Sequence, residues 1–367
     1  MSTAAARTAG PSPCLSVLSA LCVLSFVGHW WVASTWRPPD AAAAACTVHV
    51  AAPATGARLD NPAKEAPPAQ QAPARAATRG SSTSAHNGGA LPCPADRVVT
   101  WRTSNYSKFI DNVVAAVNTV TVGTKPLVWV YANWPVTGGS PAAPAGGLLL
   151  EFGVFRGESL RWLKGVKKNY SHAGPAAGFD SFRGLPDAWR TDFAAGAFKT
   201  PGNEVQRIVA DVSPEVTLEV GWFQDTLPRY LDAVDEAARL DTLSSARSSA
   251  GPSSRPVPAT LVHLDGDLFV SMVIPMQLLA DRIRPGTVLV LDDLYQFEDF
   301  EKHEMLALFL WMRQTRATLC ALATHSAVSR DPRRWGETRR LHKKVKEAPP
   351  DRQSGAFQVI RVEAQET

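Results

Sequence analysis

Hydrophobic and polar residues alternate in blocks along most of the chain after residue 100. Short apolar runs that predict strands lie at 148–152, 177–182, 217–223, 260–265, 287–293, 320–328 and 356–362. Amphipathic stretches that predict helices lie at 106–120, 158–166, 227–240, 272–283 and 298–314. This alternation is typical of an α/β domain, so we expect a doubly wound, mainly parallel sheet of seven strands with helices on both faces. The last two predicted strands follow each other directly, which indicates an antiparallel strand at the sheet edge.

The first 40 residues have the pattern of a targeting segment or signal anchor. Residues 15–32 form an apolar stretch without Asp, Glu, Lys or Arg, which is long enough to span a bilayer. Arg7 precedes this stretch, and Trp30, Trp31 and Trp36 near its far end suit a membrane interface. We therefore expect a single-pass type II membrane protein of the secretory pathway. A cleaved secretory signal, leaving a secreted protein, and an organelle transit peptide are the alternatives.

A segment of biased composition follows. Residues 41–96 consist mostly of Ala, Pro, Gly, Ser, Thr and Gln, and they include no aromatic residue. Such a segment buries too little apolar surface to offset its chain entropy, so we expect a disordered stalk. The remaining residues, 97–367, form one expected domain, within which the low-complexity stretch 242–258 is expected to be a flexible surface insertion.

Composition narrows the class of protein. The chain has 367 residues, of which 45% are hydrophobic and 20% charged, so a wholly disordered or fibrous protein is excluded. The net charge is 38 − 34 = +4 with both signs mixed along the chain, which argues against a nucleic-acid partner. Five cysteines are too few and too scattered for a disulfide scaffold, and no CxxC motif is present for zinc. The sequence leaves a homo-oligomer open.

The first candidate site follows the predicted strand at 148–152. Residues 151–157, Glu-Phe-Gly-Val-Phe-Arg-Gly, join this strand to the next predicted helix. Gly153 permits a tight turn, and Gly157 lets a ligand come close to the backbone. Glu151 lies at the end of the strand, where open α/β sheets build their binding sites. The motif is not GxGxxG, so a dinucleotide fold is disfavoured.

The next two predicted strands end in residues with two interpretations each. Asp180 is placed to bind the hydroxyls of a ribose, or to cap a turn or helix. Trp222 and Phe223 are placed to stack on an adenine ring, or to cap the hydrophobic core.

Carboxylates gather at the ends of the fourth and fifth predicted strands. Asp265 and Asp267 follow one strand, and Asp292 and Asp293 follow the other. Four like charges in one cleft would repel one another unless a divalent cation lay between them, and an oxygen-only ligand set favours Mg²⁺. The alternative is that each aspartate caps a helix separately. We interpret His263 as a core histidine with satisfied hydrogen bonds.

These motifs occur together in one known family. LLLEFGVFRGESL, GFDSFRGLP, VGWFQDTLP, HLDGDLFVS and VLVLDDLYQF stand in the order found in class I S-adenosylmethionine-dependent methyltransferases, and they most resemble the macrocin and mycinamicin sugar O-methyltransferases. The resemblance covers residues 147–297 and extends to 362 by strand pattern. It implies a Rossmann-like fold and an S-adenosylmethionine-dependent O-methyltransferase, assisted by Mg²⁺. The implied acceptor is a hydroxyl of a sugar or other polyol, in a small molecule or a glycan.

The resemblance also implies roles for single residues. The implied cofactor contacts are Glu151, Gly153, Phe155, Gly157, Ser159, Asp180, Phe223 and Gln224. The implied metal ligands are Asp265, Asp292 and Asp293. Coordination to Mg²⁺ lowers the pKa of an acceptor hydroxyl, and Asp265 or Asp267 is placed to take its proton. The chain also resembles catechol O-methyltransferase more distantly, but Leu268 stands where that enzyme has its catalytic lysine, so a lysine base is not supported.

Two other functions explain part of the pattern. An anchor, a stalk and Asp265-Gly266-Asp267 also describe a DxD glycosyltransferase, in which Mn²⁺ bridges a sugar nucleotide. That hypothesis leaves residues 151–157 and the Asp292-Asp293 pair without a role. A catalytically inactive, methyltransferase-like binding protein is the third hypothesis, and the intact carboxylates at all implied metal positions argue against it.

Overall fold

The computed structural model describes residues 92–134, 146–191, 193–244, 255–331 and 353–363, all within one unit of the chain, Thr83–Thr367. The predicted targeting segment 1–40 lies outside the described residues, and so does most of the predicted stalk 41–96. Most of the predicted insertion 242–258 also lies outside them. The described part begins slightly before residue 97, because a short 3₁₀ helix, η1 (Ala95–Arg97), precedes the first strand.

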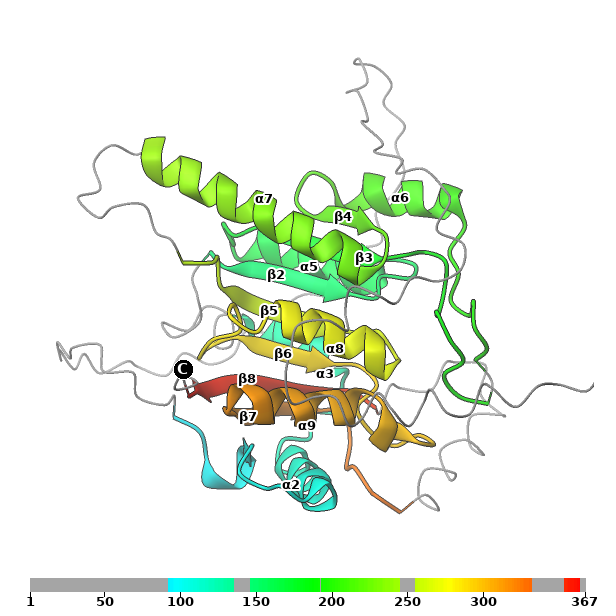
Figure 1. Cartoon of the computed structure of the whole chain (residues 1–367), viewed down its shortest axis with the longest axis vertical. Coiled ribbons are helices and arrows are strands. Elements are labelled where there is room, and N and C mark those ends of the chain that lie inside the picture. Colours follow the sequence, from blue (N-terminus) through cyan, green and yellow to red (C-terminus); the bar gives the residue numbers. More distant parts are fainter. Residues whose placement is uncertain (1–91, 135–145, 192, 245–254, 332–352, 364–367) are drawn as a thin grey trace, which may run out of the picture. The chain divides into compact units, whose positions relative to one another are not determined.

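The described strands form one mixed sheet in the order β1-β7-β8-β6-β5-β2-β3-β4 (Figure 1). Their bounds are β1 (Val98–Thr100), β2 (Leu148–Phe152), β3 (Ala176–Asp180), β4 (Thr217–Val220), β5 (Ala259–Leu264), β6 (Val288–Leu291), β7 (Ala317–Thr324) and β8 (Gly355–Val362). The strands from β2 to β6 pair in parallel. Strand β8 is antiparallel to both β6 and β7, and β1 is antiparallel to β7.

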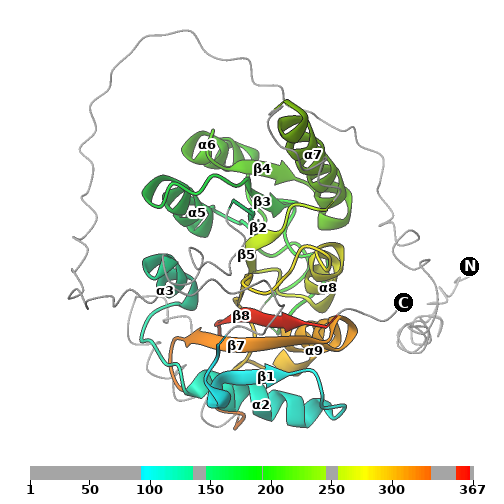
Figure 2. The same ribbon diagram turned by 90° about the vertical axis from the view of Figure 1, so that its left-hand side faces the viewer.

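Helices cover both faces of this sheet, which is the reason its central strands are continuous apolar runs. The helices are α2 (Tyr106–Asn118), α3 (Pro126–Ala132), α5 (Glu158–Asn169), α6 (Gly202–Val212), α7 (Phe223–Ser244), α8 (Phe269–Leu278), η2 (Phe300–Lys302) and α9 (Glu304–Thr315). One face is packed by α2, α7, α8 and α9, and the other by α3, α5 and α6 (Figure 2). Alternate strand residues divide between the faces: Leu148 and Leu150 join the first cluster and Leu149 the second. The predicted α/β class is therefore confirmed.

Two details of the predicted sheet are corrected. Eight strands are described in place of seven, because the short β1 adds to β7 at the sheet edge. The antiparallel strand β8 lies between β6 and β7 and not at the edge. Its residues are buried along most of their length, which suits an interior position. The sequence pattern also missed helices α3 and α6.

The predicted membrane location is corrected. The apolar stretch 15–32 on which it depended lies outside the described residues. Within the described ranges, no helix combines the length and the apolar character needed to cross a bilayer. The longest of them, α7, carries charged residues along its length, among them Arg229, Asp235 and Arg239. The structure therefore gives no support to the predicted type II anchor in the secretory pathway.

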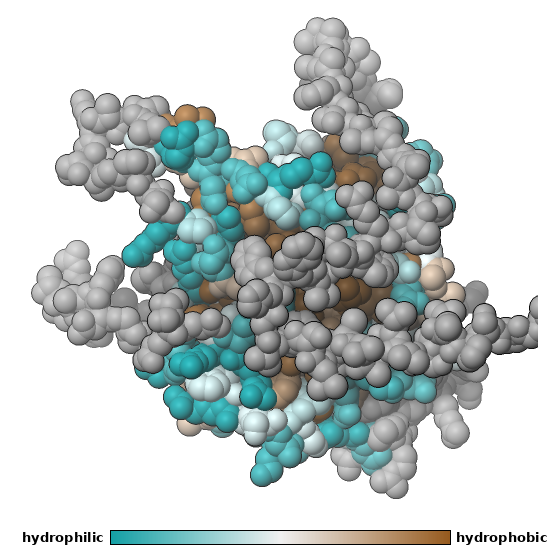
Figure 3. All heavy atoms as spheres, viewed as in Figure 1, coloured by the Kyte–Doolittle hydropathy of each residue, from teal (hydrophilic) through white to brown (hydrophobic). Residues whose placement is uncertain are grey.

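The described surface mixes polar and apolar side chains. In the view of Figure 1, brown hydrophobic residues lie among teal hydrophilic ones (Figure 3). The large exposed hydrophobic residues of α7, α8 and α9 are Leu240, Val270, Leu278 and Leu310.

A disulfide between Cys93 and Cys320 ties the residues before η1 to strand β7. The two cysteines are 227 positions apart, so the sequence pattern offered no sign of their pairing.

Candidate active site

The order in which the strands are added to the sheet reverses between the parallel neighbours β2 and β5. Strands β3 and β4 continue from β2 toward one edge, whereas β5 and β6 lie on the other side of β2. The loops after these two adjacent strands therefore lead away from each other. Ligands of open α/β sheets bind in the crevice between two such loops, at the carboxyl ends of the strands. The predicted motif 151–157 and the pair Asp265 and Asp267 follow these two strands.

Two glycines give the loop after β2 its shape. Gly153 has a φ of 91°, and a Cβ atom there would lie 1.8 Å from the carbonyl oxygen of Asp265. Gly157, at the start of α5, has a φ of 73°, and a Cβ atom there would lie 2.8 Å from Cγ2 of Ile208. Any side chain at either position would clash, so both glycines are required by the local backbone. At Gly153 the loop after β2 therefore packs directly against the backbone of Asp265, the first residue after β5.

Asp180, at the end of β3, holds this loop from the other side. Its Oδ2 accepts hydrogen bonds from the backbone N–H groups of Val154 at 2.9 Å and Phe155 at 2.8 Å. Its Oδ1 accepts from the N–H of Phe182 at 2.7 Å. The turn-capping interpretation of Asp180 therefore describes its contacts here. A carboxylate has about four acceptor positions, so capacity for a further donor is left.

The aromatic residues of the predicted cofactor site differ in exposure. Phe223 opens α7, and its ring meets the ring of Phe152 edge-on at 5.3 Å, so it packs against the core. Gln224, the next residue of α7, is half-buried. Phe155 is 37% exposed, and its ring lies 5.5 Å from that of Phe198. Phe155 is thus the aromatic residue of the predicted set that is most open to a ligand.

A row of polar side chains, each close to the next, connects the loop after β2 with the residues after β6. Ser159 donates a hydrogen bond to Glu151 Oε1 at 2.8 Å, so two predicted cofactor residues bind each other. Glu151 Oε2 lies 3.5 Å from Nδ1 of His263, and Nε2 of His263 lies 3.9 Å from Oδ1 of Asp292. Ser354 Oγ donates to the same Asp292 oxygen at 3.0 Å. The row links the loop after β2 to the residues after β6.

His263 is the buried histidine of this row. Burial alone would lower its pKa, but the carboxylates of Asp292 and Glu151 raise the pKa well above its usual value. The two contacts are longer than ordinary hydrogen bonds, so they act mainly through charge. The sequence interpretation as a core histidine was right about burial. It was wrong about satisfied hydrogen bonds, because neither ring nitrogen has a hydrogen-bond partner among the described residues, and it missed that both neighbours are site carboxylates.

Three carboxylates come together after β5 and β6. One oxygen from each of Asp265, Asp267 and Asp293 lies within 4.8 Å of the others, and we call these residues the acidic cluster. The acidic cluster shares Asp265 and Asp293 with the predicted metal set and includes Asp267, whereas Oδ1 of Asp292 lies near Ser354 and His263. Asp267 has a φ of 60°, a strained conformation for a residue other than glycine.

Burial shifts the protonation of the acidic cluster. It raises the pKa of Asp267 to about 7, although the contact with Asp293 and the charge of Arg190 lower it. Burial, followed by the charges of Asp267 and Asp292, raises the pKa of Asp293 well above its usual value. Buried carboxylates that repel one another fit a hard divalent cation, whose charge would offset the repulsion. The donor set is therefore suited to Mg²⁺.

A further buried acid, Glu304, supports the cluster from the first residue of α9. Its Oε2 accepts a hydrogen bond from the backbone N–H of Asp293 at 3.1 Å. Its Oε1 is buried without a hydrogen-bond partner among the described residues. Burial raises the pKa of Glu304 well above its usual value, and the charges of Asp265 and Asp292 add to this effect. The sequence pattern could have indicated its burial, because Glu304 precedes the apolar Leu308 by four positions and so lies on the same face of the helix.

Arg190 is the second residue that the sequence pattern missed. It lies in the loop between β3 and α6, and its Nη2 lies 3.5 Å from Oδ1 of Asp293. Its guanidinium carbon lies 3.6 Å from the ring centroid of Trp189 and 4.6 Å from that of Phe297. No periodic pattern marks a loop residue of this kind, so only the folded chain shows that it reaches the cluster.

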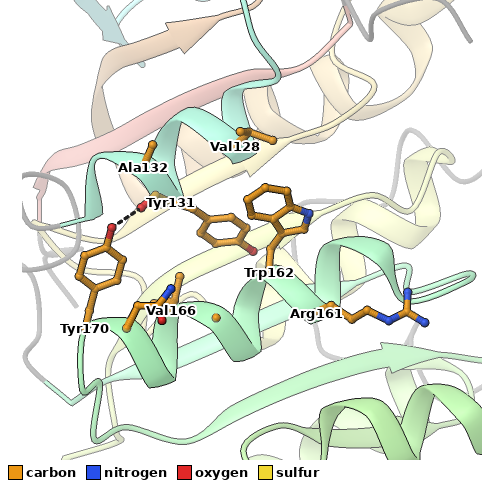
Figure 4. Close-up of a pocket in the computed structure, with 9 residues that line it drawn as sticks. Val128, Tyr131, Ala132, Arg161, Trp162, Val166 and Tyr170 are labelled. Carbon is orange, nitrogen blue, oxygen red and sulfur yellow. Dashed lines mark hydrogen bonds between the residues drawn. The ribbon is translucent and has the colours of Figure 1, made fainter. Parts of the chain in front are cut away.

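A separate groove lies between α3 and α5, with a volume of about 340 Å³ (Figure 4). Its lining residues are Val128, Tyr131, Ala132, Arg161, Trp162, Gly165, Val166, Asn169 and Tyr170. The rings of Tyr131 and Trp162 stack at 6.0 Å, and the Tyr170 hydroxyl donates to the Tyr131 carbonyl at 3.1 Å. The residues predicted for the cofactor and the metal are not part of this lining.

Comparison with known proteins gives limited similarity. No protein-family model and no curated protein matches the chain. Among solved structures, the chain is similar to CalS11, a calicheamicin methyltransferase, with 17% identity, a TM-score of 0.41, and 59% of this chain and 80% of CalS11 covered. It is also similar to the O-methyltransferase NovP, with 17% identity, a TM-score of 0.36, and 64% and 79% covered. For fibrillarin from Aeropyrum pernix, with bound S-adenosylmethionine, the values are 12%, 0.29, and 60% and 70%. At these values the similarities establish no activity for this chain.

Proposed function

We propose that this chain is an S-adenosylmethionine-dependent O-methyltransferase. The observation that carries the proposal is the contact between Gly153 and the carbonyl oxygen of Asp265. It brings the glycine-containing loop after β2 and the acidic cluster to one point of the sheet, as a cofactor and an acceptor that react with each other require. S-adenosylmethionine supplies an activated methyl group, and Mg²⁺ supplies a Lewis acid beside the acceptor oxygen.

The cofactor side is built from the loop after β2. Gly153 and Gly157 allow a ligand to come close to the backbone, and Phe155 offers an exposed ring. Asp180 fixes the N–H groups of this loop, and its remaining acceptor capacity would serve the ribose hydroxyls. Phe223 and Gln224, at the start of α7, are the residues that would lie along the adenine.

The acceptor side is built from the acidic cluster. Asp265 and Asp293, which belong to both the predicted set and the observed cluster, are the residues that would hold Mg²⁺. Asp267 would take the proton of the acceptor hydroxyl, because it is the remaining carboxylate of the acidic cluster. His263 keeps Asp292 beside this point, and Glu304 holds the backbone of Asp293.

The proposed acceptor is a hydroxyl of a sugar or another polyol. The motif resemblance implies this class, and the carboxylates of the acidic cluster are acceptors for hydrogen bonds from its hydroxyls.

Calorimetry with three ligands tests the proposal. S-adenosylhomocysteine should bind the full chain, and a sugar nucleotide with Mn²⁺ should not. Transfer of a labelled methyl group to sugar or polyol acceptors should then be lost in EDTA and restored by Mg²⁺. Binding of the sugar nucleotide alone would favour the glycosyltransferase hypothesis. Binding of S-adenosylhomocysteine without transfer to any acceptor would favour an inactive binding protein.

A further inference from the structure

Arg190 makes a contact with the acidic cluster that the proposed chemistry does not use. Its side chain is 16% exposed, and its Nη2 lies 3.5 Å from Oδ1 of Asp293. Its Nη1 lies 3.4 Å from Oε1 of Gln353, at the start of the segment that leads into β8. The guanidinium is thus directed into the interior, toward a residue that we assign to the cation site.

Aromatic rings fix this guanidinium in place. Its central carbon lies 3.6 Å from the ring centroid of Trp189, 4.6 Å from that of Phe297 and 5.4 Å from that of Phe193. Trp189 and Phe297 are themselves buried, so the rings that contact the guanidinium have little freedom to move. A guanidinium held against aromatic faces gains cation–π attraction in addition to its ion pair.

The surroundings of Asp293 explain why a cation is needed there. Asp267 and Glu304 are buried beside it, and Glu304 Oε1 has no hydrogen-bond partner among the described residues. In the chain as folded, Arg190 supplies positive charge to this group of acids. A divalent ion would bind an Asp293 oxygen at roughly 2.0–2.1 Å. The guanidinium nitrogen near the same oxygen would then face a second positive charge at short range in a poorly solvated site.

On the basis of the cation site in the proposed function, we propose that Arg190 is a built-in counter-ion that competes with the divalent cation for Asp293. Cation binding displaces the guanidinium from Asp293 and changes its stacking on Trp189. Arg190 is in this sense a positioning residue that sets the cation affinity of the site. The loop between β3 and α6 thereby responds to whether the cation is bound.

Calorimetric titration of the full chain with MgCl₂ and MnCl₂ tests the competition. Arg190→Gln and Arg190→Met both remove the charge, and the second keeps an apolar stem against the rings. Each should tighten cation binding about tenfold or more, because the repulsion at short range is lost. Arg190→Lys keeps the charge and should stay near the wild type. Arg183→Gln is the matched control, since Arg183 is exposed in the same loop and its loss changes the net charge equally.

Tryptophan emission gives a second readout that does not depend on turnover. Mg²⁺ should change the emission of the wild type, because the guanidinium leaves the face of Trp189. The change should be absent in Arg190→Gln and in Trp189→Phe. Circular dichroism and urea denaturation, measured in parallel, show that each variant is folded, and S-adenosylhomocysteine binding is measured separately.

The outcomes separate this inference from the proposed function. If the wild type binds Mg²⁺ and both neutral variants bind it equally or more weakly, the counter-ion role is overturned while the cation site stands. If neither the wild type nor the variants bind Mg²⁺ or Mn²⁺ but all bind S-adenosylhomocysteine, the cation site and the counter-ion role both fail while the cofactor site stands. Failure of S-adenosylhomocysteine to bind, with tighter cation binding in the neutral variants, would leave the counter-ion role and remove the methyltransferase proposal.

Discussion

Gly153 and Asp265 are in backbone contact across neighbouring parallel strands, with no room for a Cβ atom between them. The contact joins the loop after β2, assigned to the cofactor, to the residues after β5, assigned to the cation and the acceptor. It has a structural role as well, because the N–H of Asp265 donates to the carbonyl of Phe152 at 2.8 Å. A change at Gly153 should therefore disturb both sides of the site together.

We expect Gly153→Ala to destabilise the protein and to abolish S-adenosylhomocysteine binding. A methyl group 1.8 Å from a carbonyl oxygen forces the two loops apart, and the φ of 91° adds strain. Urea denaturation and calorimetry measure the two effects. Gly165→Ala in α5 is the control, because its Cβ would meet no atom within 4 Å, and it should stabilise by about 0.5–1 kcal/mol. Equal behaviour of the two variants would contradict the packing argument.

Asp180→Ala should weaken S-adenosylhomocysteine binding and loosen the loop after β2. Three backbone N–H groups lose their acceptor, and an unsatisfied donor costs about 1–3 kcal/mol where it is buried. The control is Asp187→Ala, which removes an exposed carboxylate that, among the described residues, accepts from the adjacent Ala188 N–H alone. Hydrogen exchange at Val154 and Phe155 should rise in the Asp180 variant alone. Unchanged ligand affinity in a folded Asp180→Ala protein would remove this residue from the cofactor site.

The strands were the most predictable part of the fold. β2, β5 and β6 are buried on both faces, so their apolar runs stand out from the flanking polar residues. The neighbour of β8 could not be read from the sequence, since strand order depends on packing between distant segments. Helix α3, which begins at Pro126, was missed because it is short, and β1 was missed because three residues carry little pattern.

The site was predictable only where it follows strand ends. Asp265, Asp267 and Asp293 come directly after β5 and β6, so the topology brings them together. The sequence could not show which of Asp292 and Asp293 belongs to the cluster, because the directions of two adjacent side chains depend on the backbone conformation. Arg190 reaches the cluster from a loop, where local sequence does not specify the path of the chain.

Reduction of the Cys93–Cys320 disulfide should destabilise the described part of the chain. The bond closes a loop of more than 200 residues, and removal of a native disulfide costs about 2–5 kcal/mol in small domains. β1, which pairs with β7 through Val98 and Cys320, should lose hydrogen-exchange protection first. Peptide mapping under non-reducing conditions should identify the linked pair. A Cys93→Ser variant with wild-type stability and β1 protection would show that the bond has no structural role.

Asp293→Asn and Asp292→Asn should differ in their effect on Mg²⁺ affinity. Asp293 belongs to the acidic cluster, so its loss removes a ligand and should lower the affinity by at least about tenfold, as a metal ligand or its immediate support does. Asp292 accepts from Ser354 and lies beside His263, so its substitution should lower the affinity less. Asp299→Asn is the control, because Asp299 pairs with Lys302 on the surface. A larger loss from Asp292→Asn would restore the metal set predicted from the sequence.

The pKa of Asp267 predicts how stability depends on pH when no divalent ion is present. The folded-state pKa is about 7, against an ordinary value of 3.8, so the folded protein holds this proton more tightly than the unfolded chain does. The stabilisation from that proton is complete below about pH 4 and is lost as the pH rises through about 7. In EDTA, the stability of the wild type relative to Asp267→Asn should therefore fall across this interval and then stay constant. Urea denaturation at fixed ionic strength measures the difference.

Mg²⁺ should reverse this trend at the upper end of the interval. Carboxylates bind the ion in their ionised form, so the stabilisation by Mg²⁺ should be greatest at and above about pH 7 and small near pH 4. Asp293 and Glu304 act in the same direction as Asp267, because burial raises the pKa of each. Glu304→Gln should therefore also flatten the pH dependence in EDTA. If the difference between the wild type and Asp267→Asn does not vary with pH, folding does not raise the pKa of Asp267, and the burial argument for this residue fails.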